Sequence, residues 1–265
     1  MTPAFIFLTA LIPTQPALVD SKPLELTTPT TLVAPAEDAV VQAAPKWTGS
    51  VNIGASYSNG NTDSRAINLA ADAERRSEAD RWTGKGYWNY NEQRDPSSGD
   101  YVLTQRRAGA SLKYDFFMTK EFYLNAIGGV ETDTLADISL RTYVGGGVGY
   151  QWREDSDVKW GSEAGLTYFN TDYKVSEDKE YLAARLANNL AWKINENTTF
   201  ENYLEAFPSL ENASDFYGKS DTKVKTNLSK TMFAQLQWIY QYTNTPADGK
   251  DRVDNLLVLG VGWSF

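Results

Sequence analysis

The chain has 265 residues, of which 42% are hydrophobic and 13% aromatic, and its formal net charge is −9. This acidic balance argues against nucleic acid as a partner, because phosphate backbones require a basic protein surface. The sequence contains neither cysteine nor histidine, which excludes disulfides, thiolate metal sites and catalysis by a histidine-activated serine or water.

Residues 1–20 have the pattern of a secretory signal peptide. An apolar stretch from Phe5 to Ile12 is followed by small and polar residues, as in the hydrophobic region of such peptides. An unstructured N-terminus is the alternative, since no Lys or Arg precedes the stretch. Residues 21–46 are rich in Pro, Thr and Ala without strand periodicity, so we expect a flexible extended segment there.

From Trp47 to Phe265, apolar and polar residues alternate with a period of two, which predicts β-strands. We distinguish about twelve alternating segments of roughly ten residues, the length of a strand that crosses a bilayer at a tilt. The mean hydropathy of −0.46 excludes a helical membrane protein, because no long apolar run follows the N-terminus. A barrel agrees with this value, since each strand turns one face to lipid and the other to water.

The expected connections differ on the two sides of the strands. On the side of the N-terminus the predicted turns are short, at residues 77–80, 118–121, 153–157, 194–197 and 229–231. On the other side a tight turn at 59–63 is followed by longer loops at 92–100, 131–139, 170–179, 209–215 and 243–251. This asymmetry is typical of outer-membrane barrels. The sequence therefore predicts an all-β fold over residues 47–265, a closed antiparallel transmembrane β-barrel of about 12 strands in an up-and-down meander.

Aromatic residues gather at the predicted strand ends on the apolar face. Those on the side of the N-terminus form a predicted periplasmic belt that includes Trp47, Trp82, Trp152, Trp160, Trp192, Trp263 and Phe265. A second group, around Trp88, Tyr168 and Tyr240, lies at the opposite ends. Amphipathic rings settle at lipid–water interfaces, whereas a soluble β-sandwich or lipocalin-like barrel, the alternative fold, has no reason to sort its aromatics by height.

Charged residues fall on the face that the alternation predicts to line the lumen. They include Lys85, Arg107, Arg141, Glu163, Arg185, Glu201, Glu205, Lys223, Lys225 and Asp254. We interpret them as an ion-paired network that neutralises a polar interior; a catalytic site made of carboxylates alone is the less favoured alternative. The run from Gly145 to Gly147 with Gly149 lacks the lysine and the helix of a phosphate-binding loop, so we expect glycines of a bent strand.

Three strings in this part of the chain carry a family resemblance: WTGSVNIGASYSNGNTDSRAINL, YVGGGVGYQW and LVLGVGWSF. They resemble the YdiY-like, salt-induced outer-membrane proteins, and the likeness extends from about Trp47 to Phe265. The resemblance implies a bacterial outer-membrane barrel. It supplies no catalytic residues to carry over.

These observations leave three functional hypotheses. The first is a narrow passive pore for small hydrophilic solutes, within a role in envelope maintenance or stress adaptation. The second is a structural barrel with a plugged lumen, because Tyr87, Tyr123, Tyr143, Phe169 and Tyr203 point inward by the same alternation. The third, an enzyme using carboxylates, ranks last, and we expect no catalytic residue, cofactor or metal.

We expect the chain to reside in the outer membrane of a Gram-negative bacterium. Its expected partners are the lipid and lipopolysaccharide of that membrane, and the barrel-assembly machinery, which would read the C-terminal strand ending at Phe265. We expect no nucleic-acid partner and assign no oligomeric state.

Overall fold

The computed structural model describes residues 45–58, 63–212, 214–247 and 249–265. The predicted signal peptide and most of the predicted flexible segment lie outside these residues. Within the described part, no helix is long and apolar enough to cross a membrane.

The regular elements of the described residues are twelve β-strands. Their bounds are β1 Trp47–Ser58, β2 Ser64–Arg76, β3 Asp80–Arg94, β4 Tyr101–Phe117, β5 Phe122–Asp133, β6 Ile138–Glu154, β7 Val158–Tyr173, β8 Lys179–Lys193, β9 Thr198–Pro208, β10 Phe216–Asn227, β11 Met232–Thr243 and β12 Val253–Ser264.

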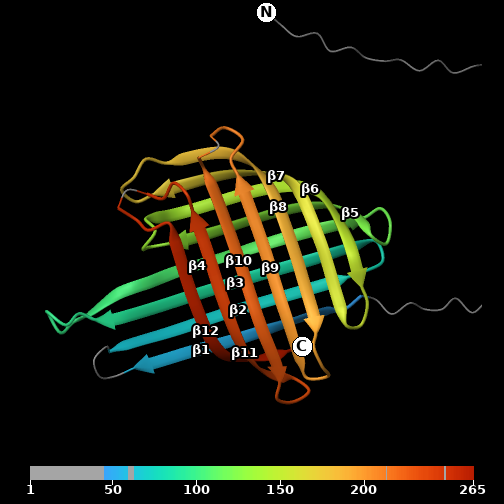
Figure 1. Cartoon of the computed structure of the whole chain (residues 1–265), viewed down its shortest axis with the longest axis horizontal. Helices are drawn as coiled ribbons and strands as arrows, with labels where there is room; N and C mark the ends of the chain where they lie inside the picture. Colours follow the sequence, from blue (N-terminus) through green and yellow to red (C-terminus); the bar gives the residue numbers. More distant parts are fainter. Residues whose placement is uncertain (1–44, 59–62, 213, 248) are drawn as a thin grey trace, which may run out of the picture. The chain divides into compact units, whose positions relative to one another are not determined.

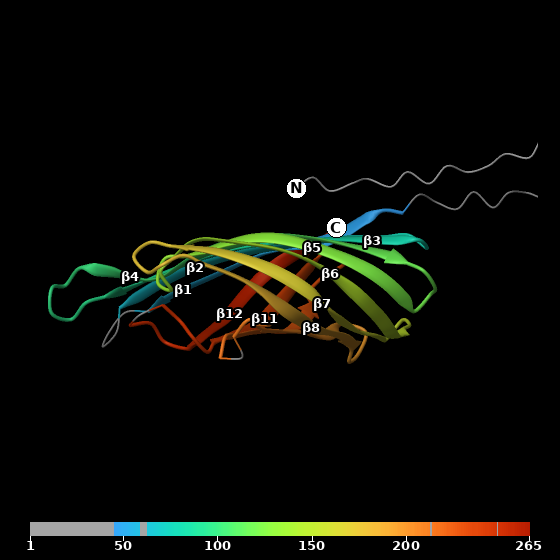
Figure 2. The same cartoon turned by 90° about the horizontal axis from the view of Figure 1, so that it is seen from above.

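Each strand pairs antiparallel with the next along the chain, and β12 pairs with β1 to close a barrel. Figure 1 shows β6 to β12 crossing in front of β1 to β4, and Figure 2 shows the same strands from above. The C-terminal residue takes part in the closure, because Phe265 and Gly49 exchange backbone hydrogen bonds of 3.0 and 3.1 Å. The predicted all-β, closed antiparallel meander is confirmed.

Burial alternates along the strands with polar side chains inside. In β1, Ser50 and Asn52 are 5% and 6% exposed, whereas Val51 and Ile53 are 48% and 42% exposed. The barrel thus turns apolar side chains outward and polar ones inward, opposite to the usual arrangement in a water-soluble protein. Such an apolar surface is suited to lipid.

The connections match the expectation more closely on one side than on the other. On the side of Trp47 and Phe265 they cover residues 77–79, 118–121, 155–157, 194–197 and 228–231. On the far side β3, β5 and β7 extend beyond their predicted ends, so the loops 95–100, 134–137 and 174–178 are shorter than expected. The strand extensions are polar on both faces, as in residues 131–133. Backbone pairing continues there without the apolar alternation that made the rest of each strand recognisable.

Carboxylates organise two of these connections. In the turn after β6, Asp155 accepts the backbone N–H groups of Asp157 at 2.9 Å and Val158 at 2.7 Å. In the loop before β6, Asp137 adopts a left-handed φ of 65° and accepts the backbone N–H groups of Val175 and Ser176 at 3.3 and 3.1 Å. The second contact ties the β5–β6 loop to the β7–β8 loop.

Inward aromatic rings lie across glycines of the neighbouring strand. Three such cross-strand pairs are Tyr87 with Gly109, Tyr123 with Gly149, and Tyr143 with Gly129. A Cβ at Gly149 would lie 2.2 Å from the Tyr123 ring, so the ring occupies the space of the missing side chain. The glycine run therefore belongs to strand β6, as predicted, and Gly149 in it admits the ring of Tyr123 from the neighbouring β5.

Candidate functional site

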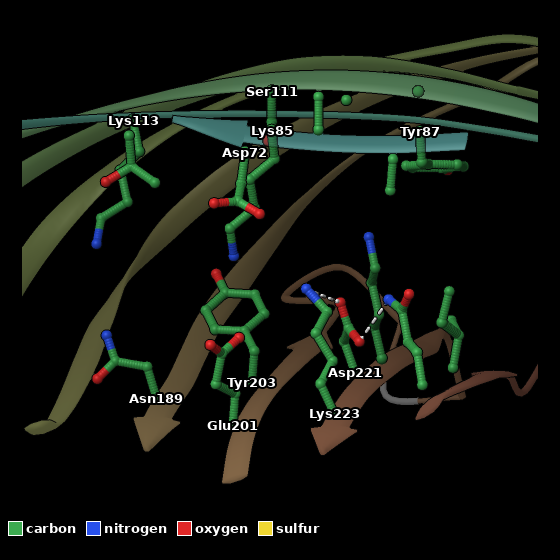
Figure 3. A pocket seen from close by; sticks show the side chains of 18 of the residues that line it. Asp72, Lys85, Tyr87, Ser111, Lys113, Asn189, Glu201, Tyr203, Asp221 and Lys223 are labelled. Carbon is green, nitrogen blue, oxygen red and sulfur yellow. Dashed lines mark hydrogen bonds and ion pairs between the residues drawn. The ribbon is translucent and has the colours of Figure 1, made fainter. Parts of the chain in front are cut away.

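A cavity of about 390 Å³ lies inside the barrel. Figure 3 shows Asp72, Lys85 and Lys113 on one wall, with Tyr203 and Lys223 on the wall that faces it. The first wall comes from β2, β3 and β4 and the second from β8 to β11. The strand alternation places these polar side chains inside because their neighbours on each strand are apolar and turn outward.

The charges of the cavity wall balance. Its seven basic residues are Arg81, Lys85, Arg107, Lys113, Lys159, Lys219 and Lys223. Its seven acidic residues are Asp72, Glu74, Glu131, Glu154, Glu201, Glu205 and Asp221. The wall is therefore neutral overall, although the chain as a whole carries −9.

Beside the cavity runs a continuous chain of ion pairs with alternating sign. It consists of Arg81, Asp115, Lys113, Glu163, Arg185 and Glu205, in that order. Arg81 Nε and Asp115 Oδ2 are 2.7 Å apart, and Lys113 Nζ lies 3.1 Å from the other oxygen of Asp115. Asp115 is fully buried. Buried charges are tolerated only when each has a partner, and this chain provides one at every step.

Arg185 occupies the centre of the far half of this chain and is 2% exposed. Its guanidinium contacts Glu163 at 2.7 Å, Glu205 at 2.8 Å and the Tyr203 hydroxyl at 2.9 Å. The hydroxyl of Tyr123, on β5, donates to Glu163 on β7 at 2.9 Å. Tyr123 reaches that distance by lying over a glycine of β6, so the glycine run allows the network to extend across β6.

An aromatic cluster occupies the far part of the lumen at the ends of β7 and β9 and the beginnings of β8 and β10. It contains Phe169, Ala183, Phe207 and Tyr217, with Tyr143 and Tyr181 packed against them. Ring centroids are 5.1 Å apart for Phe169 and Tyr181 and 5.8 Å apart for Phe207 and Tyr217. Side chains therefore fill this part of the barrel interior.

The charged residues selected from the sequence take three kinds of position. Those that line the cavity are Lys85, Arg107, Glu201, Glu205 and Lys223. Those buried in ion pairs away from the cavity wall are Arg141, which pairs with Glu131 at 2.7 Å, Glu163 and Arg185. Lys225 pairs with Glu201 at 3.1 Å, and Asp254 is exposed near the beginning of β12.

Several important inward charges were not selected from the sequence. Lys113 lies two residues after the inward Ser111 on the same strand, so the alternation of the strand already indicated that its side chain faces the lumen. The weak alternation of this strand is visible only in Thr222, Val224, Thr226 and Leu228, so Lys219 and Asp221, nearer the beginning of β10, were not recognised as inward. Neighbouring Gly218 and Ser220 show no apolar face that would have revealed the beginning of β10.

The aromatic residues selected from the sequence lie at the strand ends on the side where β1 begins and β12 ends. Trp47, Trp152, Trp160, Trp192, Trp263 and Phe265 are 43–66% exposed, and Trp82 is half-buried. Ring contacts link Trp82 to Tyr114 at 4.6 Å and Trp152 to Trp160 at 5.8 Å. These positions give one rim of the outer surface an aromatic character.

Two acids of the cavity wall, Asp72 and Glu74, make no ion pair with another described residue. Asp72 accepts a hydrogen bond from the Ser50 hydroxyl at 2.6 Å. The other carboxylates of the wall have basic partners, and no group of three acidic side chains in the described residues is placed to hold a metal ion. Ion pairs thus hold five of the seven carboxylates of the wall, namely Glu131, Glu154, Glu201, Glu205 and Asp221.

A family model described as "Protein of unknown function, DUF481" matches residues 51–265, which is compatible with the resemblance stated from the sequence. No curated protein sequence matches the chain. Among solved structures, the NanC porin has a TM-score of 0.50 at 9% identity, covering 82% of this chain and 98% of the porin. The translocator domain of the autotransporter NalP from Neisseria meningitidis has a TM-score of 0.43 at 10% identity, covering 83% of this chain and 86% of that domain. The KdgM porin has a TM-score of 0.41 at 8% identity, with coverages of 83% and 99%.

Proposed function

We propose, from the premise that this chain belongs to the DUF481 family, that it is an outer-membrane barrel whose lumen is a narrow passive path for small hydrophilic solutes. The observation that carries the proposal is the charged cavity of about 390 Å³ enclosed by a closed barrel with an apolar exterior. A lumen lined by both signs of charge offers hydration sites to polar solutes, whereas lipid excludes them.

The outer surface supports the membrane location. Large apolar side chains such as Leu166, Leu186, Leu257 and Leu259 are at least half exposed, and a monomer in water rarely exposes so much contiguous apolar surface. The aromatic rim supports a lipid–water interface at the level of these rings, because amphipathic aromatic side chains gather there. The fold shared with the NanC porin agrees with an outer-membrane location, and we extend the proposal to the Gram-negative outer membrane, with its lipid and lipopolysaccharide as surroundings.

The C-terminal strand supports insertion by the barrel-assembly machinery. From Leu257 to Trp263 every second residue of β12 is large, apolar and exposed, and Phe265, which follows the strand, pairs with Gly49 of the first strand. A role in envelope maintenance or stress adaptation is the physiological part of the proposal. Growth of a deletion strain at high salt concentration tests that part, since we expect a defect that the intact gene restores.

Single-channel recording in planar bilayers tests the path itself. We expect small, reproducible ohmic steps from protein whose folded state has been verified by heat-modifiable gel mobility. The ion-pair chain and the aromatic cluster reduce the free cross-section, so the steps should be smaller than those of a wide aqueous porin. Absence of steps at high loads of folded protein would refute the channel.

The aromatic cluster favours a second function, a structural barrel with a plugged lumen. Under that alternative the wild type is silent, and the variant Phe169→Ala/Phe207→Ala conducts because it removes two rings from the cluster. Under the channel proposal the wild type conducts already, and the double variant increases the step size.

A further inference from the structure

Three cations of the cavity wall are held by tyrosine rings. Lys85 Nζ lies 4.1 Å from the centroid of the Tyr203 ring. The guanidinium carbon of Arg107 and Nζ of Lys219 lie 5.2 and 5.7 Å from the centroid of the Tyr87 ring. None of these three cations makes an ion pair with a residue in the described part of the chain. A ring orients a cation without neutralising its charge.

This arrangement differs from that of the other basic residues near lumen rings. Lys113 lies 5.5 Å from the Tyr123 ring and Arg141 lies 5.2 Å from the Tyr217 ring. Each of these two also pairs with a carboxylate. Ring contact alone is therefore a feature that distinguishes Lys85, Arg107 and Lys219.

The nearest carboxylate to Lys219 in the strand register is bound elsewhere. Lys219 lies opposite Glu205 in the pairing of β10 with β9. Glu205 instead accepts hydrogen bonds from Arg185 at 2.9 Å and from the Tyr203 hydroxyl at 2.6 Å. The geometry thus leaves the ammonium of Lys219 without a salt bridge among the described residues. Glu131 attracts it at longer range, but the salt bridge of Glu131 is with Arg141.

Lys85 shows the same pattern. Asp72 is its register partner in the pairing of β2 with β3, but the Asp72 carboxylate accepts its hydrogen bond from the Ser50 hydroxyl. The ammonium of Lys85 points into the cavity between the two walls (Figure 3).

Arg107 supplies a second, independent observation. It is 3% exposed, and its Nε has no hydrogen-bond partner among the described residues. A buried guanidinium with an unused N–H group strongly favours an anionic acceptor. Arg107 and Lys219 flank the same tyrosine ring, and Lys85 lies two residues before that ring on the inner face of β3.

We propose that Lys85, Arg107 and Lys219 form a binding site for the oxyanion group, a carboxylate or a phosphate, of a small solute. The site rests on the proposed channel function and deepens it, because it names negatively charged solutes as the class that the lumen accepts. Arg107 contributes a directional N–H donor, and the two lysines contribute charge that is oriented by the rings.

Calorimetric titration of the full chain, folded in detergent micelles, tests the site with three probes. Inorganic phosphate and acetate represent the two oxyanion sources, and glucose is the uncharged control. We expect saturable binding of at least one anion and none of glucose. Binding of phosphate alone identifies phosphate as the recognised group, and binding of acetate alone identifies carboxylate. No saturable binding of either anion by folded wild type would overturn the site.

Charge-removing variants locate the binding. We expect Lys85→Gln, Arg107→Gln and Lys219→Gln each to lower the affinity for the anion about tenfold, which is the scale of one charge-assisted contact. Lys230→Gln, in the turn 228–231, makes the same charge change outside the cavity wall and should bind as wild type. Equal affinity in all four variants, or equal weakening in all four, would refute the assignment.

Reversal potentials in a salt gradient separate this inference from the channel itself. We expect wild type to prefer anions over cations, and Lys219→Gln to lose part of that preference. Saturable binding without conductance rejects the channel and leaves the anion site standing. Conductance without anion binding rejects the site and leaves the channel standing.

Discussion

Replacing Arg185 by methionine tests whether the ion-pair chain stabilises the barrel. The guanidinium is 2% exposed and contacts two carboxylates and one hydroxyl between 2.7 and 2.9 Å. Arg185→Met removes these contacts and leaves three acids with two bases in the chain. Removing one partner of a buried ion pair costs about 3–5 kcal/mol, and we expect a loss of that size in the free energy of unfolding.

Urea unfolding of the barrel in lipid vesicles, followed by tryptophan fluorescence and gel mobility, measures this loss. Arg153→Met is the matched control, because the pair of Arg153 with Asp155 is 58% and 42% exposed, and exposed pairs contribute little. The double variant Arg185→Met/Glu205→Gln restores equal numbers of acids and bases and should recover part of the stability. The reasoning fails if Arg185→Met is no less stable than Arg153→Met, or if the double variant equals the sum of its single changes.

Three further outcomes follow from local geometry. Gly149→Val should destabilise the barrel by about 1–3 kcal/mol, the usual penalty of overpacking, and the same substitution in a Tyr123→Ala background should cost less in urea unfolding, because the ring then no longer competes for the space. The backbone N–H of Val158, the largest of several contributions, helps to lower the pKa of Asp155 to about 2. Because folding depresses this pKa, the ionised Asp155 carboxylate stabilises the folded barrel at pH values above its ordinary pKa, and this stabilisation is lost as the pH falls through about 2. The difference in urea midpoint between wild type and Asp155→Asn should therefore disappear as the pH is lowered from the ordinary pKa to about 2. Asp137→Ala should accelerate tryptic cleavage of the β7–β8 loop in intact vesicles more than Asp137→Asn does, since asparagine tolerates the left-handed backbone; equal rates would contradict the clamp.

The sequence alone predicts the barrel because one physical constraint acts on every strand. A closed sheet in lipid must alternate apolar and polar residues, and this alternation gave the strand number, the meander and the exposed positions of residues such as Val51 and Leu257. Strand ends that extend beyond the apolar band do not contact lipid and need not alternate. Residues 131–133 and 170–173 therefore resembled loops in the sequence, although they belong to β5 and β7. Their backbone hydrogen bonds have no side-chain signature.

The candidate site was less accessible to the same reasoning. Alternation shows which side of the sheet a charge faces, but it does not show which partner the charge finds across several strands. Lys113 reaches Glu163 past two intervening strands, and this contact depends on barrel closure and on glycines of β6. The distinction between Lys113, which is neutralised, and Lys219, which is not, likewise depends on three-dimensional partners that the strand pattern does not contain.

The pairing of Gly49 with Phe265 also has a consequence for the order of assembly. The contact joins β1 to the residue that follows β12, so the barrel can close only after β12 has been synthesised and delivered. Its seam contains five register pairs, from Ser50 with Ser264 to Gly54 with Gly260, against twelve between β1 and β2. Until that seam forms, both edges present unpaired backbone groups that invite aggregation. We therefore expect closure to be the late step of insertion, and the β1–β12 seam to be the line along which the finished barrel first reopens.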